Sequence, residues 1–178
     1  GVTRLGGLEG HASYVSEYFG ERFRPREEQV TRDLNVKKFS EGSFVTNTTK
    51  AASSLMGKLR RKPEDYAHLV LQQPDARAPA SAASKLGFQE PQLAAGMVSV
   101  NLGDLGAASV PIGLAAALEA SKVGDHILVV SYGSGAGSDA LSFKVVSDRK
   151  PAFTVSGEAG RKEYIDYVQY LKLKGAIR

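Results

Sequence analysis

The sequence contains no cysteine among its 178 residues. This absence excludes disulfide bonds, metal sites built on cysteine, and a thiol nucleophile supplied by this chain. Histidine is scarce as well, and His11, His68 and His126 lie far apart with no spacing typical of metal ligands. We therefore expect no zinc site and no other metal site.

Long apolar runs are also absent. The stretches at residues 110–118 and 127–130 are much shorter than the ~20 residues of a membrane-spanning helix, and no basic segment followed by an apolar one opens the chain. A hydrophobic content of 42% and a charged content of 24% suit one globular domain with a sizeable core. These features predict a soluble, cytoplasmic protein with no membrane partner.

The formal net charge is +4, and Lys58, Arg60, Arg61 and Lys62 form a basic cluster. Nucleic-acid binding is one interpretation of such a cluster. However, no aromatic residues interleave with it, and no helix-turn-helix or RNA-binding signature follows it. The favoured interpretation is a solvated helix end, because cations stabilise a helix C-terminus and Pro63 would stop the helix.

The order of apolar segments and helix-ending signals predicts an α/β fold. Glycine commonly follows a helix, as expected at Gly87, and proline is tolerated in a first turn, as expected at Pro111. The resulting order of elements predicts a mixed β-sheet covered by helices. Residues 1–45 are expected to be an irregular, charged segment, and residues 46–178 the folded domain. We expect strands at residues 66–71, 97–102, 127–131 and 140–146, and helices at residues 46–59, 78–86, 109–121 and 164–173.

A glycine-rich turn between the last two expected strands is the most informative feature of the chain. Residues 127–130 form an unbroken apolar run, after which Gly133, Gly135 and Gly137 alternate with small residues. Such a turn allows backbone N–H groups to approach a ligand closely. The alternative is a tight β-turn whose glycines adopt positive φ angles.

Five segments carry a resemblance to a known family: SYGSGAGSDA at residues 131–140, KLRRKPEDYAHLVLQQPD at 58–75, LGF at 86–88, NLGDLGAASVPIGLAAAL at 101–118 and YIDYVQYLKLKG at 164–175. They resemble the thiolase superfamily, and most closely the C-terminal half of archaeal-type 3-hydroxy-3-methylglutaryl-CoA synthases, which are similar to ketoacyl synthase III. The resemblance implies that this chain is one thiolase-like half, either a fragment or a natural split subunit.

The same resemblance implies a second, similar half that packs against this one. Family members carry a nucleophilic cysteine in their N-terminal half, at a helix N-terminus that lowers the pKa of the thiol. We therefore expect a cysteine-bearing N-terminal half or partner subunit. Residues 109–121 are a candidate for the layer shared by the two halves, since a helix that is apolar on nearly every face is normally buried.

Two positions depart from the residues that the family uses in catalysis. Where active synthases read HQPN this chain reads QQPD, so Gln72 takes the place of the histidine and Asp75 that of the asparagine. Where they read GNTYSG it reads GDLGAA, so Asp104 takes the place of the catalytic asparagine. Glutamine can donate a hydrogen bond but cannot shuttle a proton, and a carboxylate repels a developing oxyanion unless it is protonated. His68 would lie roughly 13 Å from Gln72 along the same strand and cannot replace the missing histidine.

The resemblance also implies a coenzyme A thioester as substrate or ligand, with no covalently bound cofactor. The backbone N–H near Ser134 corresponds to a family contact to the thioester oxygen, and Gly133 and Gly135 belong to the same pocket wall. Arg77 corresponds to a basic residue that contacts the coenzyme A phosphates, although an exposed charge at a helix start is an equal alternative. Attraction of these phosphates is a third interpretation of the basic cluster at residues 58–62.

Two functions from different classes follow. The first is half of an acyl-CoA condensing acyltransferase whose partner half supplies the cysteine. The second is a non-catalytic thiolase-fold scaffold subunit, in a homo- or hetero-oligomer with a thiolase and a small zinc-ribbon and OB-fold protein. A cysteine-bearing adjoining half would distinguish the first from the second. Nucleic-acid binding is a distant third, which steep salt dependence would identify.

Overall fold

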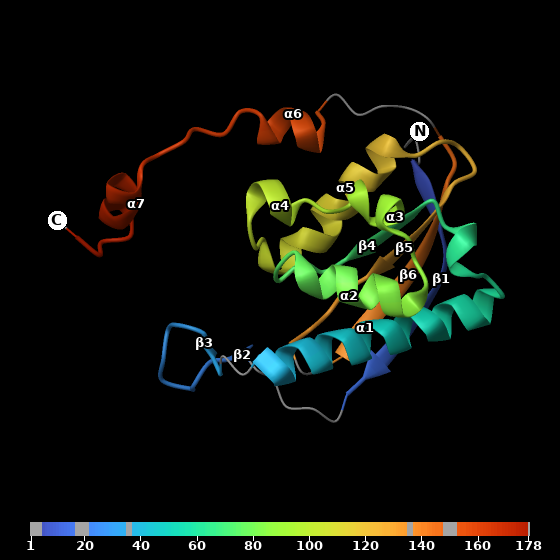
Figure 1. The fold of residues 1–178 in the computed structure, drawn as a ribbon, viewed down its shortest axis with the longest axis horizontal. Helices are drawn as coiled ribbons and strands as arrows, with labels where there is room; N and C mark the ends of the chain where they lie inside the picture. The colour runs from blue at the N-terminus through green and yellow to red at the C-terminus, as the bar shows by residue number, and fades with distance from the viewer. Residues whose placement is uncertain (1–4, 17–21, 35–36, 135–136, 148–152, 178) are drawn as a thin grey trace.

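The central feature of the computed structural model is a four-stranded β-sheet with helices on both faces (Figure 1). The structure describes residues 5–16, 22–34, 37–134, 137–147 and 153–177. Across the sheet the strands follow the order β1 (Gly6–Val15), β6 (Gly137–Val145), β5 (His126–Val130) and β4 (His68–Leu71). Strands β4 and β5 pair in parallel, whereas the other neighbours are antiparallel. The predicted mixed sheet is therefore confirmed.

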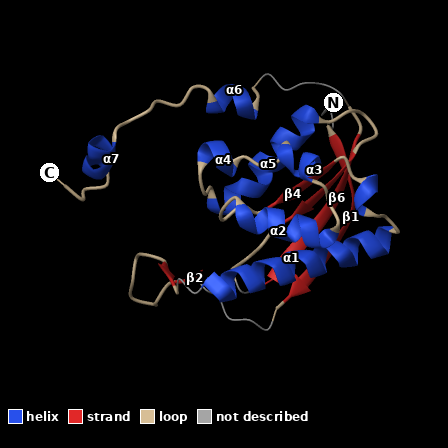
Figure 2. Cartoon of the chain, viewed as in Figure 1, coloured by secondary structure: helices blue, strands red, loops and turns tan. Residues whose placement is uncertain are grey.

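Helices cover the sheet and connect its strands (Figure 2). Their bounds are α1 Lys37–Leu59, α2 Arg77–Leu86, α3 Glu90–Ala94, α4 Ser99–Leu102 and α5 Ser109–Ala120, with 3₁₀ turns η1 Pro63–Asp65 and η2 Gly106–Ala108. None of the helices in the described part of the chain combines the length and the apolar character that a bilayer span requires.

Alternating side chains of β5 build two separate cores. Leu128 and Val130 point to one face, where they pack with residues of α1 and α2. Ile127 and Val129 point to the other face, where they pack with Ala117 of α5. Each of the four β5 side chains is at most 2% exposed, so each contributes roughly 1.5–3 kcal/mol through burial. An apolar run without polar alternation is thus explained by helix layers on both faces of the sheet.

Helices α1 and α2 end in the same way but with different residues. The N–H of Phe88 bonds the carbonyl of Ala83 at 3.0 Å, across Gly87 with φ +88°. The N–H of Arg61 bonds the carbonyl of Met56 at 2.9 Å, across Arg60 with φ +51°. Glycine adopts this left-handed conformation without strain, whereas an arginine does so at a cost. The predicted end of α2 at Gly87 is confirmed.

The predicted strand at residues 97–102 is wrong, because α4 forms there instead. The alternating apolar residues of this segment favour a strand locally. In the fold, however, the N–H of Ser99 bonds Oε1 of Gln73 at 2.9 Å, and the N–H of Gly103 closes the turn on the carbonyl of Ser99 at 2.8 Å. A contact with a distant part of the chain overrides the local pattern.

The expectation of irregular structure before residue 46 is wrong for residues 6–15, which form β1. The glycine-rich β1 lacks an alternating apolar pattern, and pairing with β6 from Gly6 opposite Val145 to Val15 opposite Gly137 makes it a strand. Helix α1 also begins earlier than expected and runs through residue 45. Between β1 and α1 the chain forms a short antiparallel pair of strands, β2 (Arg22–Phe23) and β3 (Arg32–Asp33). The organisation of residues 46–178 as a separate domain stays a prediction.

The C-terminal part of the chain contains α6 (Val155–Ala159) and α7 (Tyr167–Leu173). Helix α6 is held to α5 by a 2.7 Å hydrogen bond from the N–H of Val155 to Oε1 of Glu119. Helix α7 stands apart from the sheet and its covering helices (Figure 1). It begins later than predicted, where Asp166 caps it by accepting a 2.7 Å bond from the N–H of Gln169.

Candidate functional site

The carboxyl ends of the parallel strands β4 and β5 meet at Gln72. Its backbone N–H bonds the carbonyl of Val130 at 3.1 Å, which extends the parallel pairing by one residue. The Gln72 side chain is only 8% exposed, and its Oε1 accepts no hydrogen bond from the described residues. A buried carbonyl oxygen without a donor is costly. Together with its place at the carboxyl edge of parallel strands, where α/β folds bind ligands, this marks Gln72 as a candidate contact for a bound molecule.

Asp104 lies in the exposed loop that connects α4 to α5. Its Oδ1 accepts a 2.8 Å hydrogen bond from the N–H of Gly106, and its Oδ2 lies 3.6 Å from Nη1 of Arg22. Both carboxylate oxygens therefore face positive or N–H groups. Because the two side chains are 37% and 46% exposed, solvent screens this ion pair strongly and its contribution to stability is small.

The glycine turn between β5 and β6 is closed by two backbone hydrogen bonds. Gly133 donates to Gly137 at 2.9 Å and accepts from it at 3.3 Å. A Cβ atom on Gly137 would lie 2.2 Å from the carbonyl oxygen of Tyr14 on β1, so the close approach of the two strands requires glycine there. Gly135 lies outside the described residues. The role of the Ser134 N–H as an oxyanion contact stays a prediction.

Arg22 connects the glycine turn to the Asp104 loop, and sequence reasoning missed it. Its backbone N–H donates to Oγ of Ser134 at 3.1 Å, and its guanidinium faces both Asp33 (3.1 Å) and Asp104 (3.6 Å). The structure thus brings Asp104 and Ser134 to one residue of the β2–β3 hairpin. The sequence shows dense charge between residues 22 and 33, but this pattern does not indicate which residues Arg22 contacts.

Asp75 and Arg77 begin α2. Oδ1 of Asp75 accepts hydrogen bonds from the N–H groups of Arg77 (2.7 Å) and Ala78 (2.8 Å), which satisfies donors at the helix start. Asp75 therefore has a structural role as a helix cap. The Arg77 side chain is exposed, and no described residue pairs with its guanidinium. Its contact with coenzyme A phosphates stays a prediction.

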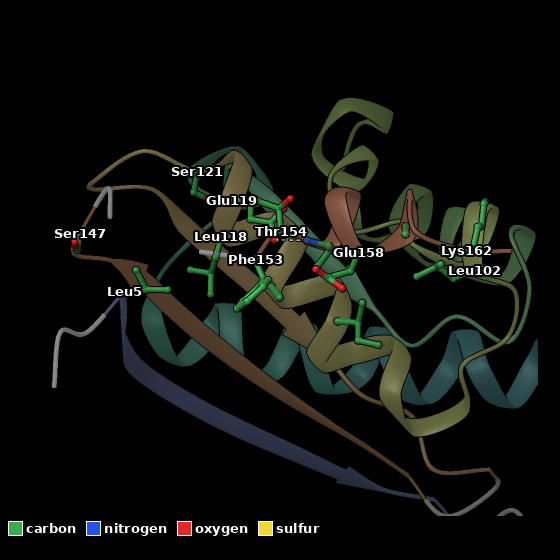
Figure 3. Close-up of a pocket in the computed structure, with 14 residues that line it drawn as sticks. Leu5, Leu102, Leu118, Glu119, Ser121, Ser147, Phe153, Thr154, Glu158 and Lys162 are labelled. Carbon is green, nitrogen blue, oxygen red and sulfur yellow. Dashed lines mark hydrogen bonds between the residues drawn. The ribbon is translucent and has the colours of Figure 1, made fainter. Parts of the chain in front are cut away.

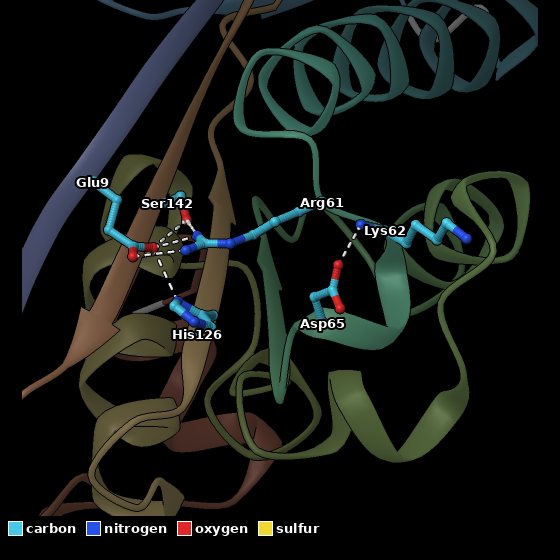
Figure 4. Close-up of polar contacts among 6 residues, drawn as sticks. All are labelled: Glu9, Arg61, Lys62, Asp65, His126 and Ser142. Atoms are coloured by element: carbon cyan, nitrogen blue, oxygen red, sulfur yellow. Dashed lines mark hydrogen bonds and ion pairs between the residues drawn. The ribbon is translucent and has the colours of Figure 1, made fainter.

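A compact polar cluster around Glu9 contains Arg61, one of the four basic residues clustered near the end of α1 (Figure 4). Glu9 lies at an irregularity in the pairing of β1 and β6, and its carboxylate accepts hydrogen bonds from Arg61, Ser142 and the His126 ring. The hydrogen bond from Arg61 lowers the pKa of Glu9 to about 2, against the opposing effect of burial. The pKa of Arg61 is raised in turn by Glu9. Arg61 thus has a structural role, holding the chain after α1 against β1, and differs from the solvated helix-end charge expected for the basic cluster.

Two of the histidines, His126 and His68, lie at the starts of neighbouring strands. His126, at the start of β5, packs in the Glu9 cluster. His68 is half-buried at the start of β4, at the opposite end of that strand from Gln72, and burial lowers its pKa. Among the described residues no group of three histidine, aspartate or glutamate side chains could hold a metal ion.

A large apolar cavity of about 540 Å³ lies between α5 and the α6 segment (Figure 3). Leu118 and Glu119 of α5 line it from one side, and Phe153, Val155 and Glu158 from the other. None of the predicted site residues lines this cavity. It lies on the face of α5 that points away from the sheet, so it marks a surface distinct from the carboxyl edge of β4 and β5.

Comparisons with known proteins agree with this architecture. The family model described as 3-oxoacyl-[acyl-carrier-protein] synthase III C terminal matches residues 56–145. Hydroxymethylglutaryl-CoA synthase from Methanococcus vannielii is 42% identical over 143 residues, which cover 78% of this chain and 41% of that protein. The Methanosarcina barkeri enzyme of the same name is 42% identical over 142 residues, with the same coverage. The chain thus spans about two fifths of the length of these relatives.

Solved structures share the fold. An HMG-CoA synthase complexed with CoA superposes with a TM-score of 0.68 at 17% identity, over 82% of this chain and 40% of that one. The 3-oxoacyl-(acyl carrier protein) synthase III from Pseudomonas aeruginosa gives 0.65 at 19% identity, over 76% and 44%. The predicted thiolase-like half, with a mixed sheet covered by helices, is confirmed. Its fold is that of an HMG-CoA synthase-like condensing acyltransferase.

Proposed function

Because this chain belongs to the 3-oxoacyl-[acyl-carrier-protein] synthase III C-terminal family, we propose that it binds an acyl-coenzyme A thioester as the C-terminal half of a condensing acyltransferase. The bound thioester lies at the carboxyl ends of β4 and β5. The second half of the enzyme, on an N-terminal segment or a partner subunit, supplies the cysteine that this chain lacks.

The observation that carries the proposal is the convergence of three segments on one edge of the sheet. Gln72 follows β4 and bonds the carbonyl of Val130 on β5, and Arg22 contacts both Ser134 and Asp104. Ligands of open α/β sheets bind outside the carboxyl ends of parallel strands. Backbone N–H groups of the glycine turn and the Nε2 group of Gln72 are donors suited to the carbonyl oxygen of a neutral thioester.

The groups on this chain and on the partner half have different roles in acyl transfer. The partner's cysteine thiol loses its proton and attacks the thioester carbonyl, and coenzyme A leaves as its thiol, so the acyl group moves from one sulfur to the other. The Gln72 amide and the Ser134 N–H stabilise the oxyanion of this step by hydrogen bonding. Gln72 cannot take up a proton, so the acid–base group comes from the partner half.

The outer parts of the coenzyme contact this chain at its surface. Arg77 pairs with a phosphate of coenzyme A, since its guanidinium is exposed and unpaired by the described residues. Gly133 forms part of the wall of the acyl pocket. The partner half packs on the apolar outer face of α5, where the cavity beside Leu118 and Phe153 leaves apolar surface uncovered.

A second candidate function rests on Asp104. Its Oδ1 accepts a hydrogen bond from the N–H of Gly106 and its Oδ2 faces Arg22, so both oxygens already face donors and the group does not replace the amide of the family asparagine. With Gln72 unable to titrate, this supports a non-catalytic thiolase-fold scaffold subunit, assembled with a thiolase and a zinc-ribbon and OB-fold protein.

Native mass spectrometry of the protein purified from its source, with identification of the co-purifying chains, tests the two candidates. A partner that carries a cysteine-bearing half supports the enzyme, and the complex should then condense acetyl-CoA with acetoacetyl-CoA. A self-associating chain, or one recovered only with a complete thiolase, supports the scaffold. Calorimetric titration with acetyl-CoA tests binding itself, and absence of heat in every recovered assembly would contradict the proposed function.

A further inference from the structure

Gln73 is a completely buried polar side chain whose amide is satisfied at both ends. Its exposed fraction is 0%. Nε2 donates to the carbonyl of Gly96 at 2.7 Å and to that of Leu71 at 3.2 Å, while Oε1 accepts from the N–H of Ser99 at 2.9 Å. A buried amide with all these partners is strongly specified, because loss of any partner leaves an unsatisfied group.

The partners of Gln73 lie at both ends of one segment, residues 96–109. Gly96 and Ser99 begin this segment, and Ser109 ends it. The backbone N–H of Gln73 donates to Oγ of Ser109 at 3.2 Å, and that hydroxyl donates to the carbonyl of Gly106 at 2.9 Å. Gln73, two residues after the end of β4, therefore fixes the segment at its start and its end, with Asp104 between them.

Small residues make this approach possible. A Cβ atom on Gly113 of α5 would lie 2.8 Å from the carbonyl oxygen of Gly96 and 3.4 Å from Nε2 of Gln73. A Cβ atom on Gly96 would lie 3.0 Å from a methyl carbon of Val70. Helix α5, strand β4 and the start of the segment thus pack directly around the Gln73 amide. A side chain at position 96 or 113 would not fit without displacing its neighbours.

We propose that Gln73 is a positioning residue, which holds the Asp104 loop against the carboxyl end of β4 so that Asp104 and Gln72 border the same site. This inference rests on the proposed function for the identity of the site. The anchoring requires an amide, since the two carbonyl partners need a donor and the Ser99 N–H needs an acceptor. Among uncharged side chains of that length, only glutamine combines two N–H donors with an acceptor.

Hydrogen exchange of backbone amides in the full chain, together with acetyl-CoA titration, tests the proposal. Gln73→Met keeps the length of the side chain and removes its hydrogen bonds. We expect exchange across residues 96–109 to rise by at least about tenfold, while the amides of β5 stay protected, and acetyl-CoA binding to weaken. Gln92→Met is the matched control. Gln92 also donates to two carbonyls, those of Pro63 and Tyr66, but at the other end of β4.

Gln73→Glu adds a second measurement, the pH dependence of amide protection, which a purely packing role of residue 73 would not change. The introduced carboxyl can donate to Gly96 only when protonated, and burial raises its pKa. Protection factors across residues 96–109, corrected for intrinsic exchange, should therefore fall as pH rises in this variant and stay flat in the wild type. If Gln73→Met does not fold, Gly113→Ala replaces it in the same exchange experiment. This variant displaces the Gly96 carbonyl and leaves Gln73 unchanged.

Two results would overturn the proposal: protection of residues 96–109 that changes no more in Gln73→Met than in Gln92→Met, or protection that is independent of pH in Gln73→Glu. If the exchange results hold but wild-type protein binds no acetyl-CoA, the anchoring of the loop by Gln73 stands and the proposed function fails.

Discussion

Arg61 donates hydrogen bonds to both carboxylate oxygens of Glu9, which lies 52 positions earlier in the sequence. The pair joins the end of α1 to β1, and both side chains are about one fifth exposed. Ser142 on β6 and His126 on β5 complete the contacts of the carboxylate. The cluster therefore connects one end of the helix layer to three of the four strands.

Glu9→Gln should lower stability at neutral pH and have little effect in strong acid. The folded pKa of Glu9, about 2, lies below its ordinary value of 4.5. The stabilisation is therefore complete above about pH 4.5 and is lost as pH falls from there toward 2. Linkage sets an upper bound of about 3 kcal/mol on this contribution. Denaturant unfolding of both proteins at pH 7, 4 and 2 measures it, and a difference that does not shrink in acid contradicts the assignment.

Arg60→Gly should stabilise the protein by up to about 1 kcal/mol, because glycine adopts the left-handed conformation at the end of α1 without strain. Chemical denaturation monitored by circular dichroism measures the change. Gly87→Ala provides the opposite control at the end of α2, where a similar loss is expected. Equal effects of the same sign at both positions would show that the backbone angle does not decide the stability of these helix ends.

Gln72→His combined with Asp104→Asn should raise condensation of acetyl-CoA with acetoacetyl-CoA in the assembly that contains the cysteine-bearing half. General acid–base catalysis commonly contributes ~10²–10⁴-fold, so a gain within this range is expected if the rest of the pocket is intact. Each single variant is assayed alone, since only Gln72→His restores a proton-transferring group. No gain from the double variant would favour the scaffold function.

Arg77→Ala should weaken binding of acetyl-CoA by about tenfold at low salt, the loss expected for one charge-assisted contact to phosphate. Binding of acetyl-pantetheine, which has no phosphate, should be unchanged. Lys85→Ala, in the last turn of the same helix α2, removes an exposed cation far from the site and serves as the control. Equal weakening by both variants would mean that net charge alone attracts the coenzyme.

The elements that sequence analysis predicted well are those with strong local signals. The unbroken apolar run of β5 and the glycines that follow it define a strand and a turn in any context. The terminal glycine of α2 works in the same local way. Residue types could also identify Gln72 and Asp104 as departures from the family pattern, since that comparison needs no coordinates.

The features that were missed depend on partners far away in the sequence. Strand β1 has no alternating pattern and exists through its pairing with β6. Residues 99–102 look like a strand, but the contact of Ser99 with Gln73 makes them helical. Arg22 reaches Asp104 and Ser134 through folding alone. A single sequence carries no record of such pairings.

The pairing of β1 with β6 also has a consequence for how the protein is made. Ser13 and Asp139 lie opposite each other but are 126 positions apart. During synthesis β1 leaves the ribosome well before the strand that completes it, and at ~5–20 residues per second its edge stays unpaired for several seconds or more. Closing so long a loop is slow compared with forming a helix. The three glycines of β1 leave little apolar surface on the unpaired strand. This lowers its tendency to pair with other chains before β6 is synthesised.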